Sequence, residues 1–538
     1  VLRTSWGVPT DLDPRRARSA ADARYVAALF EGLTAVGPDG RAAAPGVAEA
    51  WEQSDDGRTW TFHLRKDARW SNGDPVTAGD FVFAWRRALR GGSEFAPLFR
   101  DMKNVGPWLD GLEADAILAQ YEDLGGQARA RSARLEATAR RRHVAALKRR
   151  GEEAAARRAE ARPDAGEDDL GFRAVDDRTL RIELERRAPW LPHTLAFMAF
   201  VPLHRRSLEE HGERWVQPGT MVSNGPYVYS ASTPVSLVLT RNARYWDPVA
   251  AAAPARIEIG LHTPPVALEK FLDGKLDWVA REQVPDDRRA GLEGVVRGPA
   301  WGTFFLRLNL RTAPLDRPEV RRALAQGLDR AAVAKAAGQR TADGLVPPVY
   351  PGYPGATAPA HDKAAAMEAL LNASGLDLSS LPMIEILTAD VFGMAAAAAA
   401  VAEQLEKTLG LRARVKVLQV PALLEATALG QFQAAMGGWM GDVFDPSTFL
   451  EGWSSSDARH GTGWSNAGFD ALLAEAGEEA ATDKRLALLA RAEALLLGEV
   501  PLIPLYGPSD EILAAPSVQG LRPSPAGPYP LKHVRLKS

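Results

Sequence analysis

The amino-acid sequence predicts an α/β protein with more than one lobe, and two observations support this fold class. The chain has 538 residues, well beyond the length at which a single hydrophobic core stops growing, so two or three lobes are expected. Its carboxyl-terminal third alternates strand-like and helix-like patterns. That order is typical of a mainly parallel sheet with helices on its faces.

The overall composition is that of an ordinary globular protein. Hydrophobic residues make up 46% of the chain, charged residues 25%, and the formal net charge is -3. A nearly neutral chain lacks the strongly basic footprint of a nucleic-acid binder. The sequence has no cysteine, which excludes disulfides, thiolate metal sites and cysteine nucleophiles. The most apolar run, Met394 to Ala402, is far shorter than the ~20 residues of a membrane span and is interpreted as a packed helix.

The first half of the chain mixes strand and helix patterns. Arg58 to Leu64 alternates polar and apolar residues, which indicates a half-buried strand. Thr77 to Asp80 resembles a capping box, and the helix that it opens places three apolar residues on one face. Further strands are expected at 179–184 and 235–240, with a turn at Asn224 to Tyr227. The apolar helix face, interpreted as core, consists of Phe81, Trp85 and Leu89.

A basic insertion is expected at about Gly111 to Asp169. Between Gln127 and Arg162 the sequence has twelve Lys/Arg and four Asp/Glu residues among many alanines. This pattern predicts a long solvated helix or a helical hairpin. Two roles stay open, a charged surface insertion, which is favoured, and a docking arm for an acidic partner.

The carboxyl-terminal third predicts a β-α-β-α-β unit. Gly410 stands where a helix C-cap is expected. The elements are a strand at 384–387, a helix at about 395–409, a strand at 415–420, a short helix from about Ala422 and a strand at 432–436. Ligands of such sheets bind outside the carboxyl ends of the strands. Gly437 to Asp442 follows the last of these strands and is therefore a candidate ligand site.

The side chains of this segment favour a ligand pocket. Aromatic residues surround a single carboxylate, Asp442, as in sites with an apolar lining and few orienting polar groups. Trp439, beside glycine, is assigned to the pocket, whereas Phe449 is assigned to the core. Asp442 and Asp445 form a possible carboxylate pair, but acidic pairs in loops are more often solvated or capping groups.

Enzyme motifs are missing from the sequence. It contains no His-Glu-x-x-His, no phosphate-binding Gly-x-x-x-x-Gly-Lys-Ser/Thr and no Gly-x-Ser-x-Gly. The nine histidines are scattered, and none of them pairs at metal-ligand spacing. We therefore expect no catalytic residues, no cofactor and no metal site.

Several motifs, in order, resemble the oligopeptide- and dipeptide-binding group of extracytoplasmic solute receptors that serve ABC importers. Each motif is weak alone, and their order along nearly the whole chain is the stronger signal. They are Leu12–Pro14, Leu29–Leu33, Pro45–Trp51, Ser54–Phe62, Leu64–Trp70, Asp80–Phe81, Asn224–Tyr227, Asn242 with Tyr245–Trp246, Pro318–Leu324, and Asp329–Arg330.

The resemblance implies a two-lobed periplasmic-binding-protein fold with an extra α+β domain inserted near the amino end. The first lobe is expected in three pieces, at 1–38, 172–300 and 501–538. The extra domain is expected at 39–171 and the second lobe at 301–500.

The resemblance also implies a ligand site and a mechanism. In a Trp-x-x-Asp segment the aspartate, here Asp442, receives the α-ammonium group of a short peptide. Gly438 and Met440 would hydrogen-bond the peptide backbone as an added strand, and the backbone around Ala20 would flank its other side. The expected ligand-binding residues are Asp442, Gly438, Trp439, Met440, Ala20, Val420 and Leu424. The lobes would close about a hinge, and the complex would dock on a membrane permease.

Departures from the family pattern keep the ligand open. Val420 and Met436 stand where some relatives have an aromatic and a basic residue, so a ligand carboxylate would need another partner. Alternative ligands are a nickel chelate, an oligosaccharide, an opine or haem, and an alternative role is that of a receptor or chaperone. We expect a monomer in the periplasm or cell envelope, with any lipid anchor on residues outside this sequence and no nucleic-acid partner.

Overall fold

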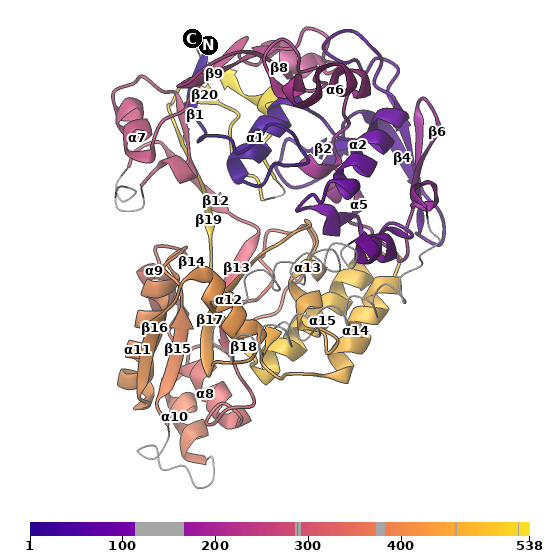
Figure 1. Cartoon of the computed structure of the whole chain (residues 1–538). Helices are drawn as coiled ribbons and strands as arrows, with labels where there is room; N and C mark the ends of the chain where they lie inside the picture. The colour runs from indigo at the N-terminus through magenta and orange to yellow at the C-terminus, as the bar shows by residue number, and fades with distance from the viewer. Residues whose placement is uncertain are drawn as a thin grey trace, which may run out of the picture.

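The computed structural model describes residues 1–112, 166–285, 288, 292–372, 382–457, 460–525 and 527–537. Two lobes lie one above the other in Figure 1, and each is built on its own mixed sheet. The long helix or helical hairpin expected in the basic insertion falls almost entirely outside the described residues. Within the described ranges, no helix combines the length and apolarity that crossing a membrane requires.

The first lobe contains a seven-stranded sheet in the order β12-β19-β11-β1-β10-β9-β8. Only β1 pairs in parallel, with β10 and β11, and the other neighbours are antiparallel. Segments from the start, the middle and the end of the chain meet in this sheet. Its strands and helices are β1 (Leu2–Ser5), α1 (Ala20–Leu29), β8 (Tyr227–Thr233), β9 (Ser236–Arg241), β10 (Arg256–Gly260), α7 (Pro264–Leu272), β11 (Trp278–Ala280), β12 (Val295–Pro299) and β19 (Ser509–Ala514).

Short two-stranded sheets and helices complete this half of the molecule. They are β2 (Thr34–Val36) with β3 (Ala43–Pro45), β20 (Val518–Gln519) with β21 (Arg535–Leu536), α5 (Leu191–Thr194) and α6 (Arg205–His211).

The extra domain is a four-stranded antiparallel sheet in the order β4-β5-β7-β6, covered by α2. The expected boundary at residue 171 falls directly before β6, and the sheet continues past it. The strand expected at 58–64 and the helix expected after Thr77 are both confirmed. The elements are β4 (Ala48–Gln53), β5 (Thr59–Leu64), α2 (Ala78–Arg90), β6 (Phe172–Asp176) and β7 (Thr179–Glu183).

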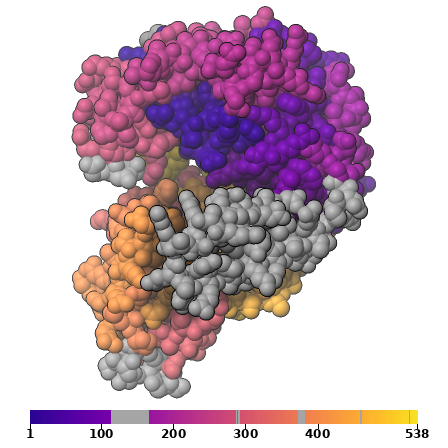
Figure 2. All heavy atoms as spheres, in the orientation of Figure 1, coloured from indigo at the N-terminus to yellow at the C-terminus, as the bar shows by residue number. Residues whose placement is uncertain are grey.

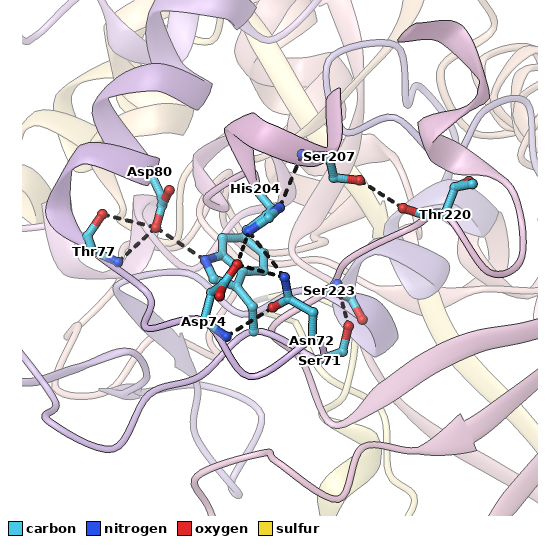
Figure 3. Close-up of polar contacts among 10 residues, drawn as sticks. Ser71, Asn72, Asp74, Thr77, Asp80, His204, Ser207, Thr220 and Ser223 are labelled. Atoms are coloured by element: carbon cyan, nitrogen blue, oxygen red, sulfur yellow. Dashed lines mark hydrogen bonds and ion pairs between the residues drawn. The ribbon is translucent and has the colours of Figure 1, made fainter. Parts of the chain in front are cut away.

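The start of α2 is held by the predicted capping box. Asp80 accepts a hydrogen bond from the Thr77 backbone N–H at 2.8 Å and another from the Trp70 indole at 3.2 Å. The same loop reaches the chain after β7 through His204, whose Nε2 lies 2.9 Å from Asp74 Oδ2 (Figure 3). These contacts fasten the extra domain to the first lobe.

The second lobe contains a six-stranded sheet in the order β14-β18-β13-β17-β15-β16. Its elements are β13 (Gly302–Leu308), α8 (Pro318–Gly327), α9 (Arg330–Ala336), β14 (Arg340–Thr341), α10 (Lys363–Asn372), β15 (Ile384–Thr388), α11 (Met394–Leu409), β16 (Ala413–Val417), α12 (Val420–Ala428), β17 (Ala434–Met440), α13 (Ser447–Leu450), α14 (Ala467–Glu478), α15 (Thr482–Glu499) and β18 (Leu502–Gly507). The expected boundary at residue 500 falls just before β18, which pairs with β13 in this sheet.

Three expectations for this lobe were wrong. The three strands of the predicted β-α-β-α-β unit do pair in parallel, β15 with β16 and with β17, but the whole sheet is not mainly parallel, because β13, β14, β17 and β18 are joined by antiparallel pairings. The strand expected at 415–420 ends at Val417, since Pro421 favours the start of a helix over a strand interior. The last strand runs on to Met440 instead of ending at 436, because β13 pairs with its whole length.

Two neighbouring segments of chain connect the lobes. One leads from β12 to β13 and the other from β18 to β19 (Figure 1). The Ala300 N–H of the first donates to the Pro508 carbonyl of the second at 3.0 Å. A pair of short crossover segments is the arrangement that hinged closure requires.

A second contact between the two halves, which we call the brace, joins the chain around α5 to residues that flank α13 and to α15. Arg186 binds Asp101 at 2.7 Å on its own side and Glu451 of the second lobe at 3.0 Å. The remaining brace residues are Trp190 beneath the Arg485 guanidinium (5.0 Å) and His193 beside the Phe444 ring (5.7 Å).

A buried charge cluster anchors the carboxyl-terminal segment in the first lobe. Lys532 Nζ lies 3.2 Å from Glu31 and 3.0 Å from Asp247, and the Lys532 and Glu31 side chains are 8% and 7% exposed. The Trp246 indole donates to the second oxygen of Glu31 at 2.5 Å. Breaking such a cluster leaves uncompensated charge in the interior.

We therefore expect Lys532→Met to lower the free energy of unfolding of the first lobe by about 3–5 kcal/mol, measured by urea denaturation followed by tryptophan fluorescence. The control is Lys275→Met, whose exposed pair with Asp273 should change stability by about 0–1 kcal/mol. Equal effects of the two substitutions would contradict the anchoring role.

The brace should weaken in acid. Burial lowers the pKa of His193 below its ordinary value, against the opposing effect of Asp445 and Asp39. The contribution of neutral His193 to the stability of the brace is therefore complete above about pH 6.5 and is lost as the pH falls through the lowered pKa. Small-angle scattering should show the two halves separating between about pH 7 and about pH 5. His193→Phe, which keeps a ring against Phe444, should remove this transition; an identical transition in the variant would contradict the assignment.

Candidate ligand-binding site

A cavity of about 770 Å³ lies between the two lobes, beside the connecting segments. Figure 2 shows the front of the molecule hollowed between the upper and lower lobes. The first lobe contributes Ala20, Arg24, Trp278 and Gln283 to its wall, among others. The second lobe contributes Trp301, Phe392, Met440 and Gly441. The end of β17 and the start of α1 therefore line the same cavity.

The hydrogen bonds of β17 leave part of one strand edge open. Gly441 N donates to Trp301 O, and Asn309 N donates to Gln433 O, both at 2.9 Å. The intervening register pairs Gly302 with Met440 and continues without a shift. Because hydrogen-bonded pairs alternate along antiparallel strands, the odd-numbered residues of β17 bond to β13. The backbone groups of the even-numbered residues point to the opposite side.

On that opposite side, the pairing of β17 with β15 ends at Ala435. Among the described strands, none pairs with this edge farther along. Gly438 and Met440 are exposed, so their N–H and C=O groups face open space beside the cavity. An extended chain laid along this edge would continue the sheet, as in strand addition.

The glycine at position 438 is required by packing. A Cβ there would lie 2.4 Å from Phe304 Cε1, which is far inside contact distance. Gly438 therefore lets the backbone of β17 lie directly on the Phe304 ring.

Asp442 lies directly after this edge. It is exposed, and its backbone N–H faces the Thr448 hydroxyl at 3.3 Å. Phe449, assigned to the core, is only 2% exposed. Trp439 is 42% exposed but is not in the cavity wall, so its assignment to the pocket stays a prediction. Gly438, Trp439, Met440 and Asp442 are thus brought together on one exposed segment, of which Met440 lines the cavity and the other three lie outside its wall.

On the facing wall, Ala20 begins α1 after the N-cap Ser19. Asp22 is fully buried and completes a capping box with Ser19. Burial alone would raise the pKa of Asp22, but hydrogen bonds from the backbone N–H groups of Arg18, Ser19 and Thr10 lower it overall. The carboxylate thereby fixes the loop that presents Ala20 to the cavity.

The other two expected residues do not join this group. Val420 and Leu424 lie on α12, are 40% and 63% exposed, and are not in the cavity wall. The strand expected through Val420 gives way to a helix, and this turns both positions onto its surface.

Asp445 has a structural role. Both of its oxygens bind the Arg485 guanidinium at 2.8 Å, and the two side chains are 1% and 5% exposed. It is therefore not a partner of Asp442 in acid–base chemistry. Within the described part of the chain, no cluster of three or more His, Asp or Glu side chains could hold a metal ion.

The sequence reasoning missed the charged wall of the first lobe. Arg24 binds Glu282, with Nη2 and Oε2 3.0 Å apart, and burial raises the pKa of nearby Asp510. The indole of Trp278 and the amide oxygen of Gln283, both in the cavity wall, are buried without a hydrogen-bond partner. These residues are far apart in sequence and follow no motif, so only the fold brings them together.

Comparisons with known proteins agree with this architecture. Residues 42–461 match the family described as bacterial extracellular solute-binding proteins, family 5 middle. The chain is 29% identical over 509 residues to the probable deoxycholate-binding periplasmic protein YgiS of Escherichia coli, covering 93% of this chain and 86% of the relative. It is 27% identical over 526 residues to the periplasmic murein peptide-binding protein MppA of the same organism, covering 95% and 88%.

A solved structure of MppA, a murein tripeptide-binding protein in its unliganded open form, superposes with a TM-score of 0.80 and 25% identity. The match covers 100% of this chain and 97% of that structure, so the two-lobed fold expected from the sequence is confirmed. With its family match extending over most of the length, the chain belongs to the bacterial extracellular solute-binding proteins of family 5.

Proposed function

We propose that this protein binds short peptides between its two lobes as the solute-binding component of an ABC importer. The observation that carries the proposal is the open edge of β17, where the backbone groups of Gly438 and Met440 point away from β13 and Met440 lines the interlobe cavity. Main-chain groups are common to all peptides, so an edge of this kind binds many sequences. The similarity to a murein peptide-binding relative supports the same ligand class.

Asp442 supplies the charge that a peptide amino terminus needs. It follows the edge by two residues, is exposed, and comes directly after Gly441 of the cavity wall. A cation that enters a closing cleft loses hydration, and a nearby carboxylate offsets that loss. Ala20, presented by the facing lobe, would contact the other side of the bound chain.

Closure of the lobes follows from their connections. The two crossover segments are short and joined by the Ala300–Pro508 hydrogen bond, so they can act as a hinge. A ligand that touches both walls favours the closed form by its differential affinity for that form. The closed complex is the species that a membrane permease would recognise.

The remaining expectations fit this role. We propose that the protein acts as a monomer in the periplasm or cell envelope, with no catalytic activity and no cofactor; any lipid anchor would lie on residues outside this sequence. One relative is named as a probable deoxycholate-binding protein, so a bile acid is the non-peptide ligand to test beside peptides.

Calorimetric titration tests the peptide assignment. Asp442→Asn should weaken the binding of a tripeptide with a free amino end by about 3–5 kcal/mol, because it strands the buried ammonium group. Acetylating the amino end of the peptide should cost the parent protein a similar amount and the variant little more.

The matched control is Asp483→Asn, an exposed aspartate of the same lobe in α15, which should leave the affinity unchanged. Equal affinity for the free and the acetylated peptides would show that Asp442 does not bind the amino end of the ligand. If the protein binds deoxycholate but none of the peptides, the proposed ligand class is wrong.

A further inference from the structure

Phe392 is an aromatic side chain that the structure places in the interlobe cavity. Phe392 is 54% exposed and lines the cavity wall with Met440, which is 48% exposed. Covering an exposed aromatic ring is favourable, because it removes a large apolar surface from water. Large exposed apolar groups in a concave site mark positions where a ligand binds.

The backbone of Phe392 is held in an uncommon conformation. Its φ is 51°, in the left-handed region that residues with a side chain rarely occupy, and Gly393 follows with φ 77°. The Tyr506 hydroxyl donates to the Phe392 carbonyl at 3.1 Å. Conformational strain of this kind persists where surrounding contacts enforce it, and it is frequent at ligand-binding positions.

The ring also lies next to the open edge of β17. Phe304 stacks on Tyr506 with centroids 5.0 Å apart and contacts the Phe392 ring at 5.6 Å. The same Phe304 ring lies against Gly438. Gly438 and Phe392 therefore share one aromatic neighbour.

The sheet topology agrees with this placement. β15 is the neighbour of β17 on its open side and ends at Thr388. The loop that carries Phe392 follows that end, just where β17 continues with β13 on one side and no described strand on the other. A chain laid along the open edge would thus lie over the carboxyl end of β15, within reach of the Phe392 ring.

We propose that Phe392 forms an apolar subsite that selects an aromatic or large aliphatic side chain of the bound peptide. The inference rests on the proposed peptide function and adds the class of side chain that the site prefers. The peptide backbone pairs with Gly438 and Met440, and one of its side chains covers the Phe392 ring. The Tyr506 hydrogen bond and the Phe304 contact hold Phe392 in place before the ligand arrives, which reduces the conformational entropy lost on binding.

The test compares trialanine with the three tripeptides that carry one phenylalanine among alanines, using calorimetry. The parent protein should bind at least one phenylalanine peptide roughly 10- to 100-fold more tightly than trialanine, which is the scale of burying one large apolar side chain. In Phe392→Gly this preference should vanish, so that the four peptides bind within about twofold of one another, a spread that corresponds to less than half a kcal/mol.

Two further variants keep the result interpretable. Phe392→Asn removes the ring but retains a residue that tolerates positive φ, so it should behave as Phe392→Gly does if the ring is what matters. Leu429→Ala, an exposed apolar residue of the same lobe outside the cavity wall (61% exposed), should leave the preference intact.

The outcomes separate the two levels of the account. Two results would refute the subsite and leave the peptide function standing. In one, the parent protein binds all four peptides without preferring phenylalanine. In the other, the preference survives in both Phe392 variants. An equal loss of affinity for all four peptides would also refute the subsite, since it indicates damage to the shared backbone site. If no tripeptide binds to the parent protein, the proposed function fails and the subsite falls with it.

Discussion

The pairing of β17 is the constraint on which the rest of the site depends. The strand bonds to β13 over its full length but to β15 only as far as Ala435. Strand alternation then directs the backbone groups of Gly438 and Met440 away from β13, to the edge that β15 leaves unpaired beside the cavity. The close packing of Gly438 on Phe304 keeps this edge flat and open. The roles proposed for Asp442 and Phe392 both depend on a peptide that lies along that edge.

The two halves of the molecule present different chemistry to the cavity. The wall of the second lobe is apolar, with Phe392 and Met440 exposed, whereas the wall of the first lobe carries the Arg24–Glu282 pair and Asp510. The connecting segments lie at one side and the brace lies away from them, so closure must change contacts at both places. A ligand that has a backbone, a charged end and an apolar side chain matches the groups that these walls offer.

Local signals made much of the fold predictable from the sequence. The capping box at Thr77 and Asp80 and the left-handed Gly410 specify helix ends through interactions within a few residues, and both are confirmed. The extent of β17 was not predictable, because its partner β13 lies more than a hundred residues earlier in the chain. For the same reason the backbone role of Gly438 and Met440 was expected only from the family resemblance, and the spacing of residues in the sequence did not predict it. Phe392 gave no signal at all, since its backbone conformation and its contact with Tyr506 exist only in the folded lobe.

Residue-resolved amide hydrogen exchange, measured with and without a saturating tripeptide, tests the central claim most directly. Without ligand, the Gly437 and Trp439 amides should exchange slowly because β13 protects them, and the Gly438 and Met440 amides should exchange rapidly. Ligand should slow exchange at Gly438 and Met440 in particular, as expected for a strand added to the open edge. Binding that leaves these two amides unchanged would contradict the account and place the peptide elsewhere.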